Sequence, residues 1–241
     1  MIHLRNVSYA YEGCEALCAI DLDISRGESV AFIGPNGSGK STLLKLLNAI
    51  VLPDNGSYVF DGKSVTRASL KDQTFARSFH QRIGFLFQNP EAQLFCPSVE
   101  EEISFGPRQM GCAEEVVAGR IEDCLKLLDI EHLAKRPPWH LSGGEKRKVA
   151  FASILALNPE VLVLDEPMND LDPRTKRFLR EIILSLHGAG KTIICATHDF
   201  RYVEGVFKRA VVFSDDHRII REGAYDEVTS DEVFLASDNL I

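Results

Sequence analysis

The segment from position 34 to 42, Gly-Pro-Asn-Gly-Ser-Gly-Lys-Ser-Thr, constrains the fold of this chain more than any other feature. It follows an apolar run at 30–33 and leads into a helical pattern over 41–51. Glycines in such a loop let the backbone turn tightly, so that several N–H groups point into one concavity at the start of the helix. Strand, glycine-rich loop and helix in this order predict a phosphate-binding loop. In such a loop Lys40 reaches the β- and γ-phosphates of a nucleotide, and the Ser41 hydroxyl ligates Mg²⁺.

Two adjacent carboxylates, Asp165 and Glu166, follow the apolar run at 161–164. A run this short and this apolar is typical of a central parallel strand, and ligands bind at the carboxyl ends of such strands. Asp165 is therefore predicted to hold the hydration shell of the metal, and Glu166 to polarise the attacking water. A solvated turn is the alternative, and the phosphate-binding loop elsewhere in the chain argues against it.

A second helix start able to bind an anion occurs at 141–145, Leu-Ser-Gly-Gly-Glu, ahead of Lys146, Arg147 and Lys148. The Ser142 hydroxyl and the free N–H groups of Gly143 and Gly144 suit a phosphate. One phosphate-binding loop does not need a second phosphate clamp, but a second copy of the chain would use one to close over the nucleotide of the first. A capped helix without a ligand is the alternative.

Strand-like and helix-like segments alternate along the chain, which predicts an α/β fold. Further signals are a strand at 192–196 and a helix at 173–186 with a proline in its first turn. Between 89 and 159 helical patterns dominate, including one at 114–128 and one opened by the capping pair Ser98 and Glu101. We therefore expect a single domain over 1–241. Its α/β core is formed by 1–88 and 160–241, and 89–159 form an inserted helical lobe.

The composition, with 45% hydrophobic and 26% charged residues, is that of a globular protein, and the net charge of −8 argues against a role in coating nucleic acid. The longest apolar stretch, at 149–157, is too short to span a bilayer, and the first residues lack the pattern of a secretory signal. Six scattered cysteines suit a reducing cytosol. If the chain works at a membrane, we expect a partner to hold it at the cytoplasmic face.

These motifs together resemble the nucleotide-binding subunits of ABC transporters: Walker A at 34–42, the signature at 141–145 and Walker B ending at Asp165 and Glu166. The resemblance implies a P-loop ATPase with a RecA-like α/β core, an antiparallel β subdomain and an inserted helical subdomain. It also implies that Gln88 is the Q-loop glutamine near Mg²⁺ and that His198 is the switch histidine facing the γ-phosphate. Tyr11 is similar to the aromatic residue that stacks on adenine, with Tyr9 as a rival. Together with Mg²⁺, ATP would contact Tyr11, Gly34, Pro35, Asn36, Gly37, Ser38, Gly39, Lys40, Ser41, Thr42 and Asp165, and Ser142, Gly143 and Gly144 of a second subunit.

The branch of the family is indicated by the segments 87–95 and 99–107, which are similar to those of energy-coupling-factor importer ATPases. Such importers take up cobalt, nickel or vitamins with a shared transmembrane scaffold and a separate substrate-binding membrane protein. Phe87, Leu94 and Phe95 would then contact a coupling helix of the scaffold. The alternatives are a cassette of another ABC transporter class and a soluble ABC ATPase acting on ribosomes or nucleic acid. The single cassette, the acidic charge and the lack of a long heptad run argue against the soluble ATPase.

One departure from the family pattern lies in the D-loop, Met-Asn-Asp-Leu-Asp at 168–172. Met168 and Asp170 are unusual there. Because this loop should lie between two subunits, Asp170 could alter how their sites communicate, or mark a chain that prefers a non-identical partner. From Arg209 onward we expect a strand, a turn at 215–216, a second strand and an acidic tail without an interpretable motif.

Overall fold

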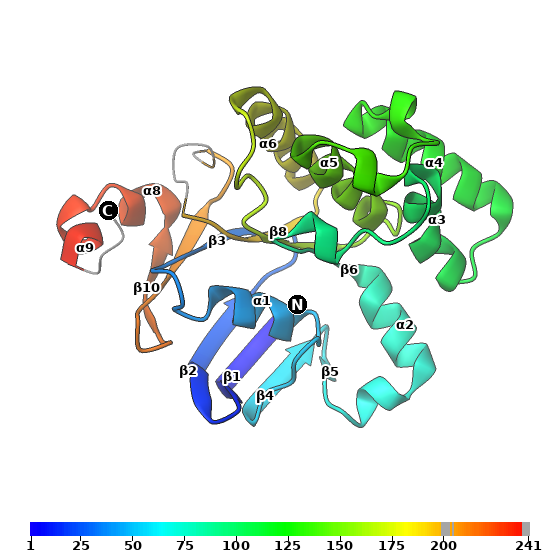
Figure 1. Cartoon of the computed structure of the whole chain (residues 1–241). Helices are drawn as coiled ribbons and strands as arrows, with labels where there is room; N and C mark the ends of the chain where they lie inside the picture. Colours follow the sequence, from blue (N-terminus) through cyan, green and yellow to red (C-terminus); the bar gives the residue numbers. More distant parts are fainter. Residues whose placement is uncertain (199–202, 204, 238–241) are drawn as a thin grey trace.

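The computed structural model describes residues 1–198, 203 and 205–237. Its centre is a six-stranded sheet in the order β10-β9-β3-β8-β7-β6 (Figure 1). The strands from β9 to β6 run parallel, and β10 pairs with β9 in the antiparallel direction. The sheet is therefore of the α/β type that the alternating sequence pattern predicts. Its strands are β3 (Ser29–Ile33), β6 (Ile83–Leu86), β7 (Val161–Asp165), β8 (Thr192–Ala196), β9 (Arg209–Phe213) and β10 (Ile219–Ala224).

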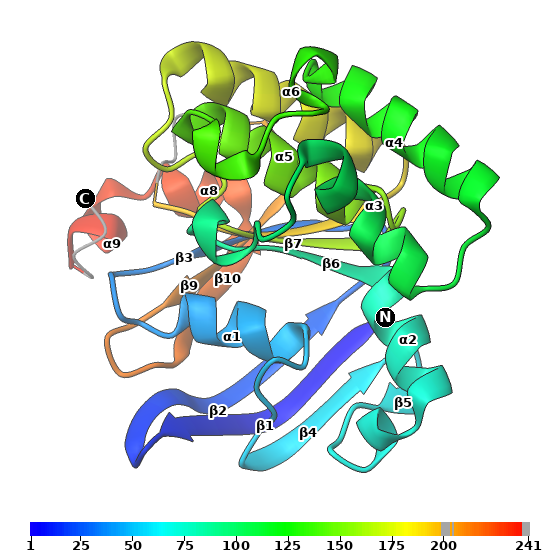
Figure 2. The ribbon, with the colours of Figure 1, turned by 45° about the vertical axis from the view of Figure 1, so that its right-hand side comes forward.

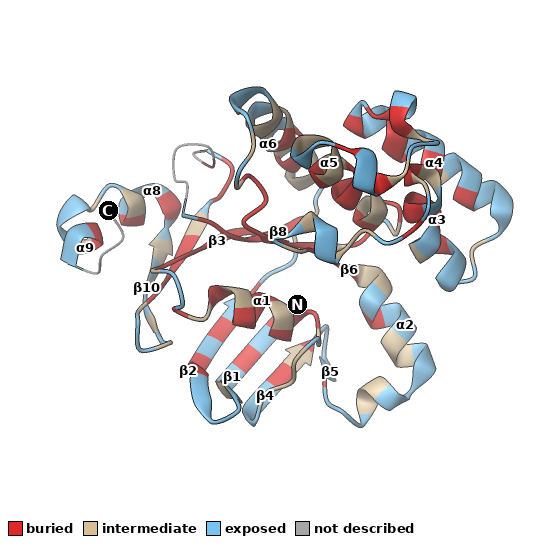
Figure 3. Ribbon diagram, in the orientation of Figure 1, coloured by how far each residue is buried: buried red, intermediate tan, exposed pale blue. Residues whose placement is uncertain are grey.

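The parallel strands are buried on both faces, which explains their uninterrupted apolar runs. In β3, Ala31 and Ile33 belong to the hydrophobic cluster on one face, while Val30 and Phe32 belong to the cluster on the other. Every residue of β3, β7 and β8 is buried (Figure 3). Burial on both faces fixes the positions of the strand ends, and these ends carry the predicted site residues.

Helices cover the two faces of this sheet unequally (Figures 1 and 2). One face carries the helical segment between β6 and β7 together with the helix that precedes β8. The other face carries α1, which separates the central sheet from a second sheet. The helices are α1 (Lys40–Leu47), α2 (Gln73–Arg82), α3 (Val99–Gln109), α4 (Glu114–Leu128), α5 (Gly143–Leu155), α6 (Pro173–Gly188), α8 (Tyr225–Thr229) and α9 (Glu232–Ser237).

The second sheet is antiparallel, with the order β2-β1-β4-β5. Buried and exposed residues alternate along much of β1 and β2, so that one face packs toward α1 and the other meets solvent (Figure 3). This sheet corresponds to the antiparallel β subdomain implied by the family resemblance. Its strands are β1 (Ile2–Tyr11), β2 (Cys14–Ile24), β4 (Asn55–Phe60) and β5 (Lys63–Ser64).

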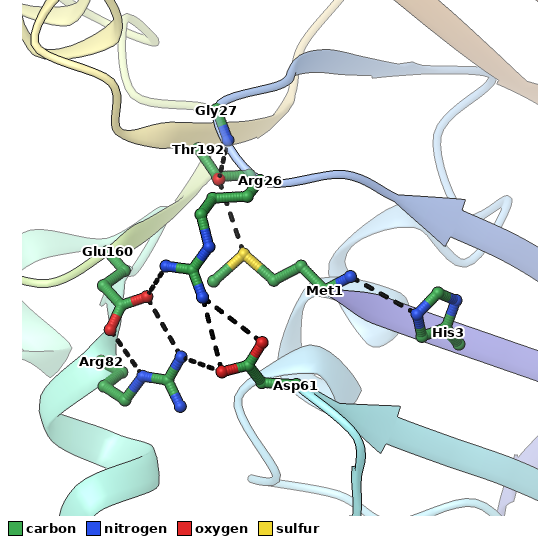
Figure 4. Close-up of polar contacts among 8 residues, drawn as sticks. All are labelled: Met1, His3, Arg26, Gly27, Asp61, Arg82, Glu160 and Thr192. Carbon is green, nitrogen blue, oxygen red and sulfur yellow. Dashed lines mark hydrogen bonds and ion pairs between the residues drawn. The ribbon is translucent and has the colours of Figure 1, made fainter.

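Four charged side chains join the two sheets where the parallel strands begin (Figure 4). Arg82 donates to Glu160 from Nε at 2.7 Å and to Asp61 from Nη2 at 2.6 Å, and its guanidinium lies 4.7 Å from the centre of the Phe60 ring. Arg26 binds the same two carboxylates. Because the carboxylates precede β7 and follow β4, the network holds the antiparallel sheet against the central one.

The helix that follows the phosphate loop is shorter than its sequence pattern predicts. It ends at Leu47 rather than near 51. Ala49 has a left-handed φ of 54°, and the N–H of Ile50 returns to the carbonyl of Lys45, which closes the helix end. The Asn48 side chain also donates to the Leu44 carbonyl at 3.0 Å.

Three other local predictions can be compared directly with the structure. The helix over 114–128 is confirmed, and Ser98 caps α3 as its sequence pattern indicates. The chain after β10 forms α8 and α9, which we did not predict from the sequence; residues 238–241 of the acidic tail lie outside the described residues. No helix in the described part of the chain is both long enough and apolar enough to cross a bilayer.

Candidate nucleotide-binding site

The phosphate-binding loop connects the carboxyl end of β3 to α1 and forms one wall of a cavity of about 400 Å³. Three segments far apart in the sequence contribute the remaining side chains: the ends of β6 and β7 and the residues after β8. The cavity thus brings Gln88, Glu166 and His198 to the phosphate-binding loop, as the family resemblance implies. Its lining residues are Asn36, Gly37, Ser38, Gly39, Lys40, Ser41, Thr42, Gln88, Glu166, Asn169 and His198.

Lys40 is held inside the loop. Its Nζ donates to the carbonyl oxygens of Gly34 at 2.6 Å and Pro35 at 2.7 Å. Burial lowers the pKa of Lys40, and the nearby carboxylates of Glu166 and Asp165 act in the opposite direction. A buried ammonium that rests on backbone oxygens is a ready partner for a polyphosphate.

Gly39 shows why this loop requires glycine. Its φ is 101°, and a Cβ atom at this position would lie 2.2 Å from the carbonyl oxygen of Ala16 in β2. Gly37 has a similar φ of 87°, but nothing lies within 4 Å of its Cβ position. Gly39 is therefore needed for both conformation and close approach, whereas Gly37 is needed for conformation alone.

Ser41 and Asp165 meet at the carboxyl end of the sheet, where the Ser41 hydroxyl donates to Oδ1 of Asp165 at 2.9 Å. Burial raises the pKa of Asp165; the Ser41 hydrogen bond lowers it, and the charge of Glu166 raises it. A hydroxyl, a carboxylate and the Gln88 amide form an all-oxygen donor set, which fits the hard ion Mg²⁺.

Glu166 is fixed by both its backbone and its side chain. Its φ of 46° is left-handed, and its N–H donates to the carbonyl of Ala196 in β8 at 3.0 Å. Its Oε1 lies 3.0 Å from Nδ1 of His198. A non-glycine residue in this conformation is uncommon, and such strain is often found at functional sites.

Tyr11 lies at the end of β1, outside the lining of the nucleotide cavity. It is 41% exposed and packs edge-on against Tyr9, with their ring centres 4.8 Å apart. Of the two rival tyrosines, Tyr11 is the more exposed.

The signature segment begins α5 with a complete capping box. The Ser142 hydroxyl accepts from the N–H of Glu145, and the Glu145 carboxylate accepts from the N–H of Ser142. Ser142, Gly143 and Gly144 line a second cavity of about 650 Å³, and none of the phosphate-loop residues lines it. Within one chain the phosphate-binding loop and the signature segment therefore face different cavities.

The D-loop runs between the two cavities, and three of its side chains lie in three different environments. Asn169 lines the nucleotide cavity, and Asp170 lines the signature cavity. Met168 is 3% exposed and lies in the hydrophobic core beside the helices. The two unusual D-loop residues therefore have different surroundings: Met168 packs in the hydrophobic core, while Asp170 faces the signature cavity. Sequence reasoning did not select Asn169 as a site residue; its position three residues after Glu166 was the available signal.

Comparison with known proteins decides the family. A family model described as ABC transporter matches residues 17–169, more than half of the chain. The chain belongs to the ABC transporter family. This ABC transporter chain is 45% identical over 219 residues to the nickel import ATP-binding protein LarO of Lactiplantibacillus plantarum, with 91% of each chain covered.

Solved structures agree with this assignment. The structure of cbiO1 from Clostridium perfringens, described as part of the ABC transporter complex cbiONQ, matches with a TM-score of 0.83. Its sequence identity is 35%, covering 99% of this chain and 94% of that one. The dimeric structure of MJ0796, a bacterial ABC transporter cassette, also has a TM-score of 0.83, with 30% identity and coverage of 93% and 99%. The α/β ABC ATPase fold is thereby confirmed, and the chain is an ATPase of this family.

Proposed function

We propose that this ABC ATPase energises an importer of the energy-coupling-factor type that takes up a transition-metal ion, nickel or cobalt, or a vitamin. One observation carries the proposal: the likeness to a nickel import subunit spans 91% of the chain. The likeness to cbiO1, from a complex of ABC transporter subunits, supports the same branch. The subunit would sit at the cytoplasmic face of the membrane, bound to a transmembrane scaffold and a substrate-binding membrane protein.

The proposed chemistry assigns a role to each residue around the nucleotide cavity. The phosphate-binding loop and Lys40 bind the triphosphate, and Tyr11 stacks on adenine. Ser41, Asp165 and Gln88 would hold Mg²⁺, partly through water, and the ion would neutralise phosphate charge. Glu166 accepts hydrogen bonds from the attacking water and orients it.

Hydrolysis would require two chains, since the signature residues face a separate cavity. Ser142, Gly143 and Gly144 of one chain would cover the nucleotide held by Lys40 of the other. ATP bound between them stabilises the closed pair by mass action. We further propose that 89–159 move as a lobe during closure and pull on the attached membrane helices, while 1–88 and 160–241 form the core.

An exposed aromatic pair is the surface best suited to the membrane partner. Phe95 is 64% exposed, and its ring centre lies 4.9 Å from that of Phe105 on α3. Phe87 and Leu94, which we also expected to contact a coupling helix, are partly buried and pack against the two hydrophobic cores. Of the predicted apolar contacts, Phe95 is the one that offers most of its side chain to a partner.

Co-purification tests this proposal. Tagged Glu166→Gln chain is recovered from solubilised membranes and its partners are identified by mass spectrometry. A shared scaffold protein together with a small substrate-binding membrane protein is the expected result. Replacement of Phe95 by Ser should reduce their recovery, whereas replacement of exposed Ile220 on β10 should not. Recovery of ribosomes or DNA-bound proteins without a membrane partner would overturn the transport role and leave the ATPase chemistry in place.

A further inference from the structure

Arg147, in the second turn of α5, holds the loop that carries Gln88. Its side chain extends into the protein, and the residue is 4% exposed. Nη1 donates to the carbonyl of Phe87 at 2.8 Å, and Nη2 donates to the carbonyl of Gln88 at 2.7 Å. The planar guanidinium thus binds two successive carbonyl oxygens just after β6, a two-point contact that a lysine ammonium reproduces poorly.

The same loop, defined here as residues 87–93, is bound to α5 at its other end. Gln93 donates to the carbonyl of Ala150 at 2.9 Å and to the hydroxyl of Ser153 at 3.1 Å. Its side-chain oxygen accepts from the N–H of Phe87 at 3.3 Å. Lys146 on α5 also forms an ion pair with Glu91. Because both ends of the loop are attached to one helix, a displacement of α5 displaces the Gln88 backbone.

Two carboxylates complete the surroundings of Arg147. Burial lowers its pKa, and the negative charges of Asp170 and Asp165 act in the opposite direction. Its Nε is buried and has no hydrogen-bond acceptor among the described residues. A buried cation bound to neutral carbonyls depends on nearby negative charge. The charges come from the D-loop and from the end of β7, so Arg147 lies where the signature helix, the Gln88 loop and the D-loop meet.

We propose that Arg147 is a positioning residue that couples the signature cavity of this chain to Gln88 in its own nucleotide cavity. Ser142 precedes Arg147 by five residues, about 7.5 Å along a continuous helix. ATP held by a second chain and bound at Ser142 would move α5, and Arg147 would carry that movement to Gln88. Each nucleotide would in this way influence hydrolysis of the other. The inference rests on the proposed two-chain site.

The test compares Arg147→Gln and Arg147→Lys with Arg120→Gln in the full-length chain. Arg120 is a matched control, because its Nη1 also donates to a backbone carbonyl at 2.9 Å, that of Ala156 directly after α5. Arg120 lines neither the nucleotide cavity nor the signature cavity. For each variant kcat, the Hill coefficient for ATP, and ATP affinity of the nonassociated chain are measured, with urea unfolding as a control for stability.

Arg147→Gln should lower kcat about tenfold or more and bring the Hill coefficient to one, because a small misplacement at a reacting centre has a large effect on rate. ATP affinity of the nonassociated chain should change by less than about twofold, since Arg147 does not line the nucleotide cavity. Arg147→Lys should recover part of the rate. Arg120→Gln should keep both kcat and cooperativity. Equal losses of stability in the two Gln variants, with kcat and the Hill coefficient retained in both, would overturn the inference.

A second variant keeps the inference testable if Arg147→Gln does not fold. Gln93→Met releases the other end of the loop without leaving a buried charge, and it should also lower kcat and the Hill coefficient. Unchanged values would count against the coupling. Absence of ATP-dependent association in the wild-type chain would instead remove the proposed two-chain site, so the two failures can be distinguished.

Discussion

Oε1 of Glu166 lies 3.0 Å from Nδ1 of His198, and both residues line the cavity formed by the phosphate-binding loop. The carboxylate is mostly buried, while the imidazole is 54% exposed at the side chain. The histidine therefore reaches the carboxylate from the open side of the cavity. This contact orients the group that we assign as the partner of the attacking water.

Replacing Glu166 by Gln should keep ATP binding and lower turnover by about 100-fold or more, because the amide cannot polarise water as a carboxylate does. The measurement is phosphate release together with ATP affinity. Glu181→Gln, on the exposed side of α6, is the control and should hydrolyse ATP at the wild-type rate. Rapid hydrolysis by the Glu166 variant would contradict its assigned role.

The two loop glycines should differ sharply when each is replaced by alanine. At Gly37 the left-handed backbone should cost about 1–2 kcal/mol of unfolding free energy. At Gly39 the left-handed backbone should cost a similar amount, and the clash with the Ala16 carbonyl should cost about 1–3 kcal/mol more. Urea unfolding without nucleotide measures both values. Equal values for the two variants would show that the close approach of β2 does not constrain the loop.

Asp165 should make the nucleotide-free protein less stable as the pH rises. Because folding raises its pKa, the folded state holds the proton more tightly, and stability falls as the pH rises through the interval between its unfolded and folded pKa values. Asp165→Asn should raise the unfolding free energy at pH 7 by about 1 kcal/mol and abolish hydrolysis.

The pH dependence of stability from Asp172 should have the opposite sign to that from Asp165, so Asp172 serves as the control. Hydrogen bonds from Thr175 and Arg174 lower its pKa, so its contribution to stability is lost as the pH falls through the folded pKa. Asp172→Ala should therefore destabilise the protein at pH 7. A stabilised Asp172 variant, or a destabilised Asp165→Asn chain, would show that the signs are wrong.

The charged network between the two sheets should contribute more to stability than an isolated surface pair. Arg82→Ala removes contacts with Asp61 and Glu160 and the packing on Phe60, and should lower the unfolding free energy by about 1 kcal/mol. Arg108, paired with exposed Glu114, is the control and should show a much smaller effect. Because salt screens charges, the difference in unfolding free energy between the two variants should be largest at low salt. If it disappears there, the charged network is not its cause.

Much of the fold could be predicted because local patterns determine it. The apolar runs of β3, β7 and β8 and the capping of α5 are readable from a few neighbouring residues. The helices α8 and α9 were missed, since five or six residues of mixed character carry little helical signal.

The candidate site could be predicted where a motif fixes chemistry and position together, as at Lys40 and Glu166. The hydrogen bonds from Arg147 to the carbonyls of Phe87 and Gln88 could not be predicted from the sequence. The residues they join are 60 and 59 positions apart, and the acceptors are backbone atoms. Because every residue has a backbone carbonyl, its use as an acceptor does not restrict which side chain occurs at that position. The separation of the signature residues into another cavity likewise depends on tertiary packing.

The central claim is that each active site combines two chains, and mixing two inactive variants tests it most directly. Lys40→Ala removes the phosphate contact, and Gly143→Asp places a carboxylate in the signature cavity, where nothing lies within 4 Å of its Cβ position. Gly119→Asp on α4, equally open, is the control and should stay active.

Each inactive variant alone should hydrolyse almost no ATP. In a mixed pair, the site made from the intact loop of one chain and the intact signature of the other is complete. An equal mixture should therefore recover up to about a quarter of the wild-type rate, since random pairing makes half of the pairs mixed and each of these has one complete site; coupling between the two sites would lower this value. A mixture no more active than its two components would contradict the two-chain site.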